Sequence, residues 1–212
     1  MLERGSVDSA VSNSAAGEAP DAGITSVKLV VAGGFGVGKT TLIGSVSEIT
    51  PLTTEAVMTA AGAGTDDLSL TPEKTTTTVA MDFGRVSIDA DLVLYLFGTP
   101  GQRRFWFMWD DLTRGAIGAV VLADSRKLAD SFAAVDYFES ARVPFIIAVN
   151  GFNGDFPHTV ADVRDALSVS PRVPMLECDA RERNSTKAVL TALVEHAMAE
   201  SRQPVAIPGP PR

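Results

Sequence analysis

The feature that most constrains this chain is a complete G-x-x-x-x-G-K-[ST] motif at residues 33–40, which read GGFGVGKT. Its glycines let the backbone curl so that successive N–H groups point inward, where they can bind phosphate oxygens. Lys39 supplies a positive charge for the outer phosphates, and the Thr40 hydroxyl can bind Mg²⁺. The motif therefore predicts a phosphate-binding loop.

The residues on either side of the motif support this interpretation. Residues 27–32 (VKLVVA) form an apolar, β-branched run that is typical of a buried strand. Residues 41–46 (TLIGSV) can open a helix, and a helix N-terminus favours an anion. A strand, a glycine-rich loop and a helix in this order predict a nucleotide-binding α/β domain.

Strand-like and helix-like segments alternate along the rest of the chain. We expect strands at 27–32, 78–88, 91–97, 117–123, 144–149 and 173–177, and helices at 38–47, 102–113, 127–141, 159–167 and 185–200. Only Asp89-Ala90 separates the second and third strands, so this pair should form an antiparallel hairpin. The other strands should be parallel and joined by helical crossovers.

The fold class that follows is α/β, a P-loop nucleotide-binding domain. We expect a six-stranded, mostly parallel sheet with one antiparallel hairpin and helices on both faces. The ligand should lie at the carboxyl ends of the strands. Residues 48–77 are the least regular internal stretch, and a connection this long is usually functional or mobile.

The ends of the chain differ in composition from its centre. Residues 1–25 are rich in Ser, Ala, Gly and acids, and residues 202–212 are rich in Pro, so we expect tails around a domain at 26–201. The net charge of −8 argues against a nucleic-acid-binding protein. Cys178 is the only cysteine, and no apolar stretch is long enough to span a bilayer. We expect a cytoplasmic protein without a membrane anchor.

A second constellation follows the strand expected at 91–97, where residues 98–105 read GTPGQRRF. A glycine here can offer its backbone N–H to a terminal phosphate, and Gln102 can orient an attacking water, as Gln does in GTP hydrolysis. Both tryptophans, Trp106 and Trp109, come next. They are either core residues or an aromatic surface that docks a partner, since aromatic residues are enriched at interfaces.

Two further segments complete the pattern: residues 150–155 (NGFNGD) follow one expected strand, and residues 178–181 (CDAR) follow the last one. Phosphate loop, threonine-bearing loop, PGQ, N-x-x-[D/N] and x-A-[K/R] occur in the order found in small Ras-like GTPases. The segment GTPGQRRFWFMWDDL resembles, more closely, the bacterial conservon-type GTP-binding proteins and the Mgl-type gliding-motility GTPases. The resemblance covers roughly residues 26–200.

The resemblance implies roles for individual residues. Gln102, Lys39 and Gly101 would be catalytic, and Thr40 and Thr78 would bind Mg²⁺. Thr75, Thr76 and Thr77 compete with Thr78 for the switch-threonine role. Asn150 would bind the base and brace the phosphate loop, and Ala180 would offer its N–H to the base carbonyl. The nucleotide would be bound by Gly34, Phe35, Gly36, Val37, Gly38, Lys39, Thr40, Thr41, Thr78, Asn150, Asn153, Asp179, Ala180 and Arg181.

Two departures from the family pattern concern the phosphates and the metal. Gly98 occupies the place of the acid in the usual D-x-x-G motif, an acid that supports Mg²⁺. Metal support would then come from Thr40, Thr78 and the phosphates. Thr77 stands where Mgl-type members tend to carry an arginine, and Arg103 or Arg104 would have to compensate. A slow intrinsic rate that depends on a partner follows.

A third departure concerns the base, because the usual N-K-x-D reads Asn150-Gly151-Phe152-Asn153. A carboxylate at the fourth position accepts two hydrogen bonds from guanine, whereas Asn153 is neutral and also brings donors. A lost charge-assisted hydrogen bond is worth roughly 1.5–3 kcal/mol. We therefore predict a weaker guanine preference, unless Asp155 substitutes for the missing acid.

The leading hypothesis is a GTP-binding switch that uses GTP, GDP and Mg²⁺ and hydrolyses GTP slowly. The resemblance implies a roadblock-type regulatory protein and a sensor-kinase-like complex as partners, which could recruit the protein to a membrane. One alternative is a non-catalytic nucleotide-binding scaffold. Another is a different P-loop enzyme, an ATPase or a small-molecule kinase, for which Asp124-Ser125-Arg126 is the nearest acidic candidate. We interpret that segment as a helix start and Cys178 as a buried residue.

Overall fold

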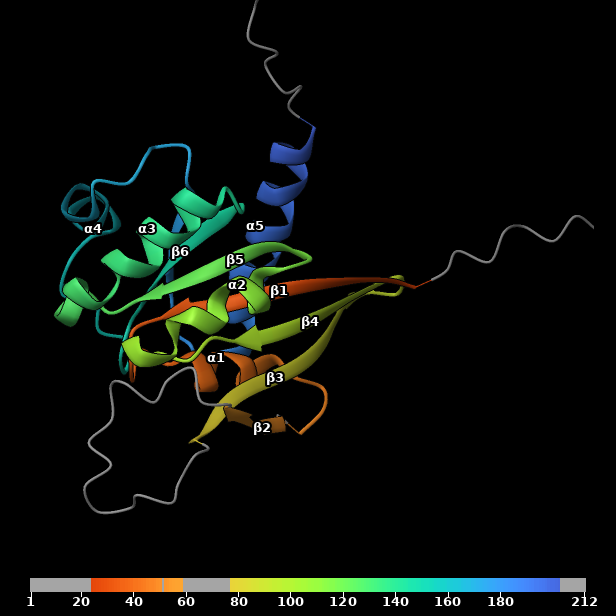
Figure 1. Ribbon diagram of the computed structural model, residues 1–212. Helices are drawn as coiled ribbons and strands as arrows, with labels where there is room; N and C mark the ends of the chain where they lie inside the picture. Colours follow the sequence, from red (N-terminus) through yellow and green to blue (C-terminus); the bar gives the residue numbers. More distant parts are fainter. Residues whose placement is uncertain (1–23, 51, 59–76, 203–212) are drawn as a thin grey trace, which may run out of the picture.

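A computed structural model describes residues 24–50, 52–58 and 77–202 of the chain. Its centre is a seven-stranded sheet with the strand order β2-β3-β4-β1-β5-β6-β7 (Figure 1). The strands are β1 (Thr25–Gly33), β2 (Leu52–Met58), β3 (Thr77–Asp89), β4 (Leu92–Gly98), β5 (Ala116–Ala123), β6 (Phe145–Asn150) and β7 (Met175–Cys178). Of the segments expected to be tails, 1–25 and 202–212, residues 1–23 and 203–212 lie outside the described part, and Thr25 already belongs to β1.

The predicted fold class is confirmed: the sheet is mostly parallel, and its antiparallel pairing is confined to one edge. Strands β4, β1, β5, β6 and β7 run parallel, whereas β3 is antiparallel to β4. All six expected strands are present. The seventh, β2, pairs antiparallel with β3 inside the stretch 48–77, where the sequence predicts no strand. Pairing with β3, rather than a local pattern, gives this edge strand its structure.

The hairpin between β3 and β4 forms as expected, but its turn lies one residue later than predicted. Asp89 pairs with Leu92, so Ala90 and Asp91 make the turn in place of Asp89 and Ala90. The register shifts between Ser87 and Asp89, which is the effect of a β-bulge. Beyond the bulge Phe83 pairs with Phe97. The shift matters for the site because it decides which residues of β3 face the end of β4.

Helices cover both faces of the sheet (Figure 1). The side chains of β1, β5 and β6 alternate between the two faces and enter both hydrophobic clusters, so these strands are buried on both sides. On one face they pack against α1 (Lys39–Val46) and α5 (Arg183–Ser201). On the other face they pack against α2 (Trp109–Thr113), α3 (Phe132–Ala141) and α4 (Val160–Leu167).

Two of the expected helices are interrupted. The helix predicted at 102–113 consists of the 3-10 helix η2 (Arg103–Met108) followed by α2, and the helix predicted at 127–141 consists of η3 (Ser125–Asp130) followed by α3. Lys127 departs from helical geometry with φ −137° and ψ 49°. Asp124 caps η3 by accepting a hydrogen bond from the Arg126 N–H, so this segment begins a helix, as interpreted from the sequence.

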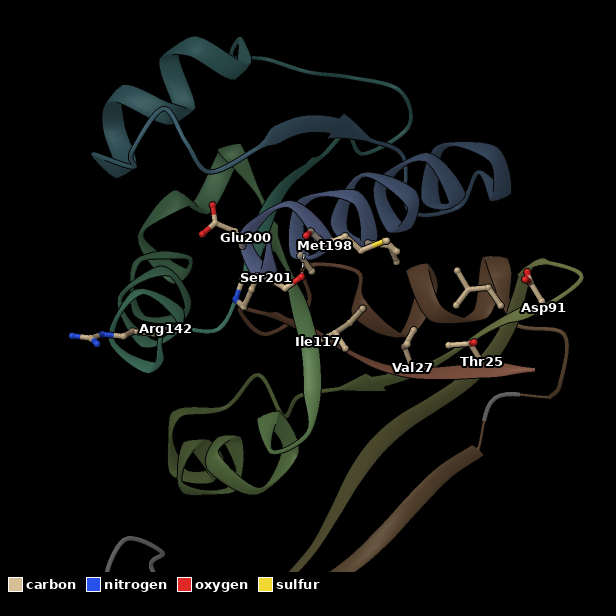
Figure 2. Close-up of a pocket in the computed structure, with 12 residues that line it drawn as sticks. Thr25, Val27, Asp91, Ile117, Arg142, Met198, Glu200 and Ser201 are labelled. Carbon is tan, nitrogen blue, oxygen red and sulfur yellow. Dashed lines mark hydrogen bonds between the residues drawn. The ribbon is translucent and has the colours of Figure 1, made fainter. Parts of the chain in front are cut away.

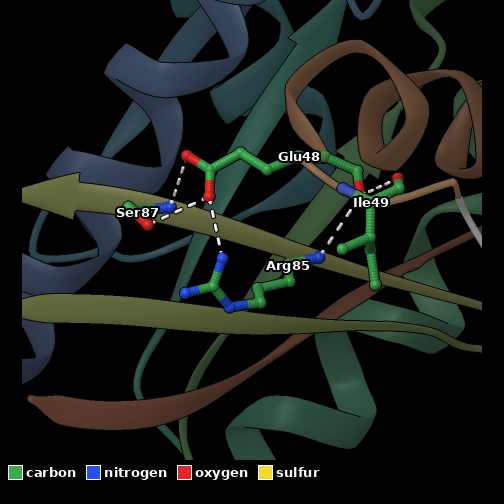
Figure 3. A network of polar contacts seen from close by, with 5 residues as sticks. Glu48, Ile49, Arg85 and Ser87 are labelled. Carbon is green, nitrogen blue, oxygen red and sulfur yellow. Dashed lines mark hydrogen bonds and ion pairs between the residues drawn. The ribbon is translucent and has the colours of Figure 1, made fainter.

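A polar network ties the segment after α1 to strand β3 (Figure 3). The Glu48 carboxylate accepts hydrogen bonds from Arg85 Nη1 at 3.0 Å, from the Ser87 N–H at 3.0 Å and from the Ser87 hydroxyl at 2.9 Å. The Glu48 N–H donates to the Arg85 carbonyl at 2.7 Å. These bonds to backbone and side chain hold the pKa of Glu48 below its usual value. The network therefore fixes where the chain leaves α1 on its way to β2.

Within the part of the chain that the structure describes, no helix is long and apolar enough to cross a bilayer.

Candidate functional site

The phosphate-binding motif forms a tight loop between the end of β1 and the start of α1. Gly33 adopts φ 141°, and a Cβ there would lie 2.4 Å from the Leu122 carbonyl oxygen, so only glycine fits against β5. Gly38 adopts φ 107°, and a Cβ there would lie 2.9 Å from Asn150 Nδ2. The loop therefore packs closely against β5 through Gly33 and against the end of β6 through Gly38. Its backbone curls at the N-terminus of α1.

Lys39 is the buried cation of this loop, with only 9% of its surface exposed. Its ammonium group donates hydrogen bonds to the carbonyl oxygens of Gly33 at 2.9 Å and Gly34 at 2.7 Å. Burial lowers the pKa of Lys39 to about 8, and the nearby Asp82 charge opposes that shift. A phosphate group bound in the loop would provide an anionic partner for this ammonium group.

Asp82 is an acid beside the loop, and it reaches the site from β3. The Thr40 hydroxyl donates a 2.6 Å hydrogen bond to Asp82 Oδ2. The pairing of β3 with β4 brings Asp82 against Gly98, where a Cβ would lie 3.1 Å from Asp82 Cβ and 3.3 Å from Oδ2. The space beside Thr40 therefore accommodates one acidic side chain, supplied by β3 and not by β4.

The donor set beside Thr40 suits Mg²⁺, because that ion prefers hard oxygen ligands such as carboxylate and hydroxyl groups. The sequence interpretation assigned metal binding to Thr40 and Thr78 and missed Asp82 as a ligand candidate. Thr78 lies four residues before Asp82 in β3 and pairs with Val57 of β2. The side chain of Thr78 lies outside the described part. A lone acid in an otherwise apolar strand segment was the available signal for Asp82.

Residues 98–101 pack directly onto the phosphate loop. A Cβ on Gly101 would lie 2.8 Å from Lys39 Nζ and 2.9 Å from Phe35 Cα. The Thr99 N–H donates to the Val31 carbonyl of β1 at 2.9 Å, and Thr99 is 3% exposed. The Pro100 carbonyl accepts from Trp109 Nε1 at 3.3 Å. The segment thus reaches the loop at the side of Lys39, where an outer phosphate would bind.

Gln102 and the two arginines after it lie on the exposed side of this segment. Gln102 Oε1 accepts a 3.0 Å hydrogen bond from Arg104 Nε. The Arg104 guanidinium lies 4.7 Å from the centre of the Phe105 ring, and that of Arg103 lies 5.6 Å from the Trp106 ring. Both arginines are therefore held against aromatic neighbours. Trp109 is 2% exposed and belongs to the core, as one of the two sequence interpretations held.

Asn150 connects the phosphate loop to the second half of the site. Its Nδ2 donates to the Val37 carbonyl at 3.0 Å, and its Oδ1 accepts from the Ala180 N–H at 3.0 Å. It is 5% exposed, so both bonds are shielded from water. Asn150 therefore braces the loop, and it does so from the end of β6.

The chain segments after β6 and β7 meet in a small hollow of about 110 Å³. It is lined by Gly38, Thr41, Asn150, Gly151, Phe152, Asn153, Asp179, Ala180 and Arg181. Arg181 Nη1 donates to Asn153 Oδ1 at 2.7 Å, and Arg181 also pairs with Asp179 through Nε at 3.0 Å and Nη2 at 2.6 Å. The sequence-predicted base-site residues thus gather in one place.

The structure also places Asp155, Gly151 and Cys178, which lie in this hollow or close to it in the chain. Asp155 is not among the residues that line it, and its charge acts on Arg126, so this arrangement does not put it in place of the missing acid. A Cβ on Gly151 would lie 2.3 Å from the Phe156 ring, so that ring fills the space a longer side chain would need. Cys178 is buried, and burial raises the pKa of its thiol, as fits a core residue.

A larger hollow of about 770 Å³ lies at the opposite ends of the strands (Figure 2). Figure 2 shows Thr25 and Val27 of β1, Ile117 of β5 and Met198 of α5 around it. Its lining includes no residue of the phosphate loop. The sequence-predicted site instead lies at the carboxyl ends of the strands, as expected for a ligand of an open α/β sheet.

Solved structures share this arrangement of the sheet and its helices. The cytosolic domain of the T. maritima FeoB iron transporter matches in its apo form with a TM-score of 0.59 and 17% identity, over 82% of this chain and 64% of that one. The GDP form I matches with the same values. The FeoB G-domain from Methanococcus jannaschii matches with a TM-score of 0.56 and 12% identity, over 82% of this chain and 99% of that one.

At these identities the likeness shows the fold alone, which is that of a P-loop G domain. The chain spans 64% of the length of the T. maritima cytosolic domain. Among curated proteins, the uncharacterised protein MJ1339 of Methanocaldococcus jannaschii is 32% identical over 126 residues, covering 58% of this chain and 69% of that protein.

A family model links these observations to nucleotide binding. The model described as "conserved hypothetical ATP binding protein" matches residues 31–200, which contain the phosphate loop, the Gly98–Gln102 segment and the base hollow. The match covers most of the chain and the whole of the candidate site. This chain therefore belongs to that P-loop nucleotide-binding family.

Proposed function

We propose that this protein is a GTP-binding molecular switch that hydrolyses GTP to GDP and phosphate. The observation that carries the proposal is the contact of Gly101 with Lys39 and the phosphate loop. An outer phosphate that reaches Lys39 must make room beside Gly101 and gains the backbone N–H groups of that segment. Its removal restores the packed arrangement, which is the principle of an order–disorder switch.

Thr40 and Asp82 are the residues that would hold Mg²⁺ at this site, with Thr78 as a further candidate ligand from the family resemblance. The ion, when bound, neutralises charge on the outer phosphates. Asp82 replaces the acid that Gly98 cannot supply, and its 2.6 Å bond to Thr40 keeps the carboxylate beside the loop. The change at Gly98 is therefore compatible with a magnesium-dependent enzyme.

Gln102 is the residue we assign to orienting the attacking water, and Gly101 offers its N–H to the terminal phosphate. In the structure Gln102 Oε1 is bonded to Arg104, so Gln102 must leave that bond to reach a water. The guanidinium groups of Arg103 and Arg104 lie against aromatic rings. The Gln102–Arg104 bond and these ring contacts support a slow intrinsic rate that a partner accelerates.

The resemblance to conservon-type and Mgl-type GTPases supports a role in signalling. By that resemblance, the partners are a roadblock-type regulatory protein and a sensor-kinase-like complex, and the complex recruits the protein to a membrane. Phe107, 53% exposed on η2, and Phe35, 74% exposed on the phosphate loop, are large apolar side chains that such a partner can cover.

The test measures phosphate release under single-turnover conditions with GTP and with ATP. Wild type is compared with Asp82→Asn, Gln102→Leu and the control Asp89→Asn, which removes an acid from the far end of β3. We expect GTP hydrolysis that requires Mg²⁺, a loss of tenfold or more in Asp82→Asn and Gln102→Leu, and no change in the control. Tight binding without turnover, with or without a partner, would instead establish the scaffold alternative.

The family's description as an ATP-binding protein favours a second candidate, a P-loop ATPase with relaxed base specificity. The same experiment separates the two. Faster turnover of ATP than of GTP at equal saturation would support the ATPase and refute the GTPase.

A further inference from the structure

The base hollow carries an inference about which nucleotide it selects, and this inference rests on the proposed function. The inner wall of the hollow presents one available donor, the second N–H of the Asn150 amide, because its first N–H donates to the Val37 carbonyl and the Ala180 N–H donates to Asn150 Oδ1. A donor on this wall suits a purine edge made of acceptors, namely N7 and a 6-oxo group. Adenine has an amino group at that position and would place donor against donor.

The outer edge of the hollow is formed by Asn153, and its amide has one permitted orientation. Arg181 Nη1 lies 2.7 Å from Asn153 Oδ1. A guanidinium group has only donors, so the amide oxygen and not the amide nitrogen must face it. The remaining polar group of the side chain is therefore the NH₂ group, which carries two donors.

Two features hold this arrangement in place. The Arg181 guanidinium is clamped by Asp179 through two hydrogen bonds of 3.0 Å and 2.6 Å, and the pairing raises the pKa of Arg181 further. Asn153 and Gly154 have φ of 59° and 74°, with an Asp155 N–H to Phe152 carbonyl bond of 3.2 Å across the turn. Asn-Gly is the sequence preferred for a turn with two positive φ values.

The donors of Asn153 conflict with guanine. The guanine edge that faces this position carries the ring N1–H and the 2-amino group, both of which are donors. Two facing donors form no hydrogen bond, and a buried donor left without a partner costs free energy. Hypoxanthine lacks the amino group, and xanthine carries an acceptor oxygen in its place.

We propose that Asn153, held by Arg181, makes this hollow a site for 6-oxopurine nucleotides that does not select the guanine amino group. GTP remains a ligand, but inosine and xanthosine nucleotides bind at least as tightly. Asn153 is the specificity-determining residue, and Arg181 is the positioning residue that sets the orientation of its amide.

The test is equilibrium binding of GDP, IDP, XDP and ADP with Mg²⁺ by calorimetry, since diphosphates avoid turnover. Variants are Asn153→Asp, Arg181→Met and, as a matched control, Arg183→Met, two residues along the chain in α5. For wild type we expect IDP and XDP to bind within threefold of GDP or more tightly, and ADP at least tenfold more weakly. Asn153→Asp tolerates the same turn and should raise the GDP-to-XDP affinity ratio by tenfold or more.

Arg181→Met tests whether Arg181 sets the orientation of the Asn153 amide or only supports the loop. Without the guanidinium the amide can flip, so the affinity for XDP should fall relative to that for GDP, whereas mere loosening would weaken both equally. Arg183→Met should leave every ratio unchanged. A wild-type protein that binds GDP at least tenfold more tightly than IDP and XDP overturns this inference and leaves the GTPase proposal standing. Preference for ADP, or no binding of any of the four, overturns the GTPase proposal itself.

Discussion

Replacing Lys39 by methionine should stabilise the nucleotide-free protein while it abolishes nucleotide binding. Methionine keeps most of the length of the side chain but removes the buried ammonium group. That group lies at a site where only 9% of the residue is exposed, and burial is the main reason for its lowered pKa. The charge is therefore held in the loop at a cost to folding.

The magnitude follows from the pKa. A decrease from 10.5 to about 8 is worth about 3 kcal/mol, at about 1.4 kcal/mol for each pKa unit. Methionine leaves the carbonyl oxygens of Gly33 and Gly34 without the ammonium donor, which costs about 1 kcal/mol. We therefore expect the free energy of unfolding of Lys39→Met to exceed that of wild type by about 2 kcal/mol at pH 7. This difference raises the Tm by about 4–8 °C for a domain of this size.

The sign of the pH dependence is fixed by the same shift. The folded pKa lies below the unfolded pKa, so the penalty is fully present below pH 8 and is relieved as pH rises from 8 to 10.5. The advantage of Lys39→Met should shrink across that window. Urea denaturation of both proteins at several pH values between 7 and 10, after removal of bound nucleotide, measures it.

Lys187→Met, on α5 and outside the phosphate loop, is the control for replacing a lysine by methionine. Lys187→Met should not be more stable than wild type at pH 7, and its stability relative to wild type should not change at higher pH. The reasoning is refuted if Lys39→Met is less stable than wild type at pH 7, or if its advantage does not change between pH 7 and 10.

Three more predictions concern the same site. Gly101→Ala should destabilise the protein by about 1–3 kcal/mol in urea denaturation, because its Cβ would lie 2.8 Å from Lys39 Nζ and 2.9 Å from the backbone of the phosphate loop; an unchanged midpoint would contradict this packing. Asn150→Ala should cost about 2 kcal/mol and weaken nucleotide binding, because it removes the bonds to the phosphate loop and to Ala180, whereas the exposed Asn184→Ala should do neither. Nucleotide binding at pH 8.5 should take up a proton at Lys39, which calorimetry in buffers of different ionisation enthalpy detects; a heat that does not depend on the buffer would contradict it.

The register of the β3–β4 hairpin shows where prediction from the sequence stopped. The hairpin itself was predictable because two strand-like runs are separated by a turn-length gap. The bulge between Ser87 and Asp89 was not, since no residue pattern marks it, and a one-residue shift changes which side chains face each other. That shift brings Asp82 against Gly98, so the acid that β4 lacks is supplied by β3.

Strand β2 and the interrupted helices have a similar explanation. The backbone of β2 pairs along its whole length with β3, a contact between segments that are far apart in the chain. Helix α2 is tied to the site through Trp109, whose indole N–H reaches the Pro100 carbonyl. Local propensity decides such segments less than the partner that satisfies their backbone groups.

The sequence by itself determined the phosphate loop, because the glycines, Lys39 and Thr40 act within eight consecutive residues and their chemistry is local. It also determined the alternation of strands and helices, since buried parallel strands need continuous apolar runs. Only the tertiary structure decided that Asp82 meets Thr40 and that Arg181 turns the amide of Asn153. Those contacts join residues 42 and 28 positions apart, and their geometry depends on strand order, register and turn conformation, which no local pattern encodes.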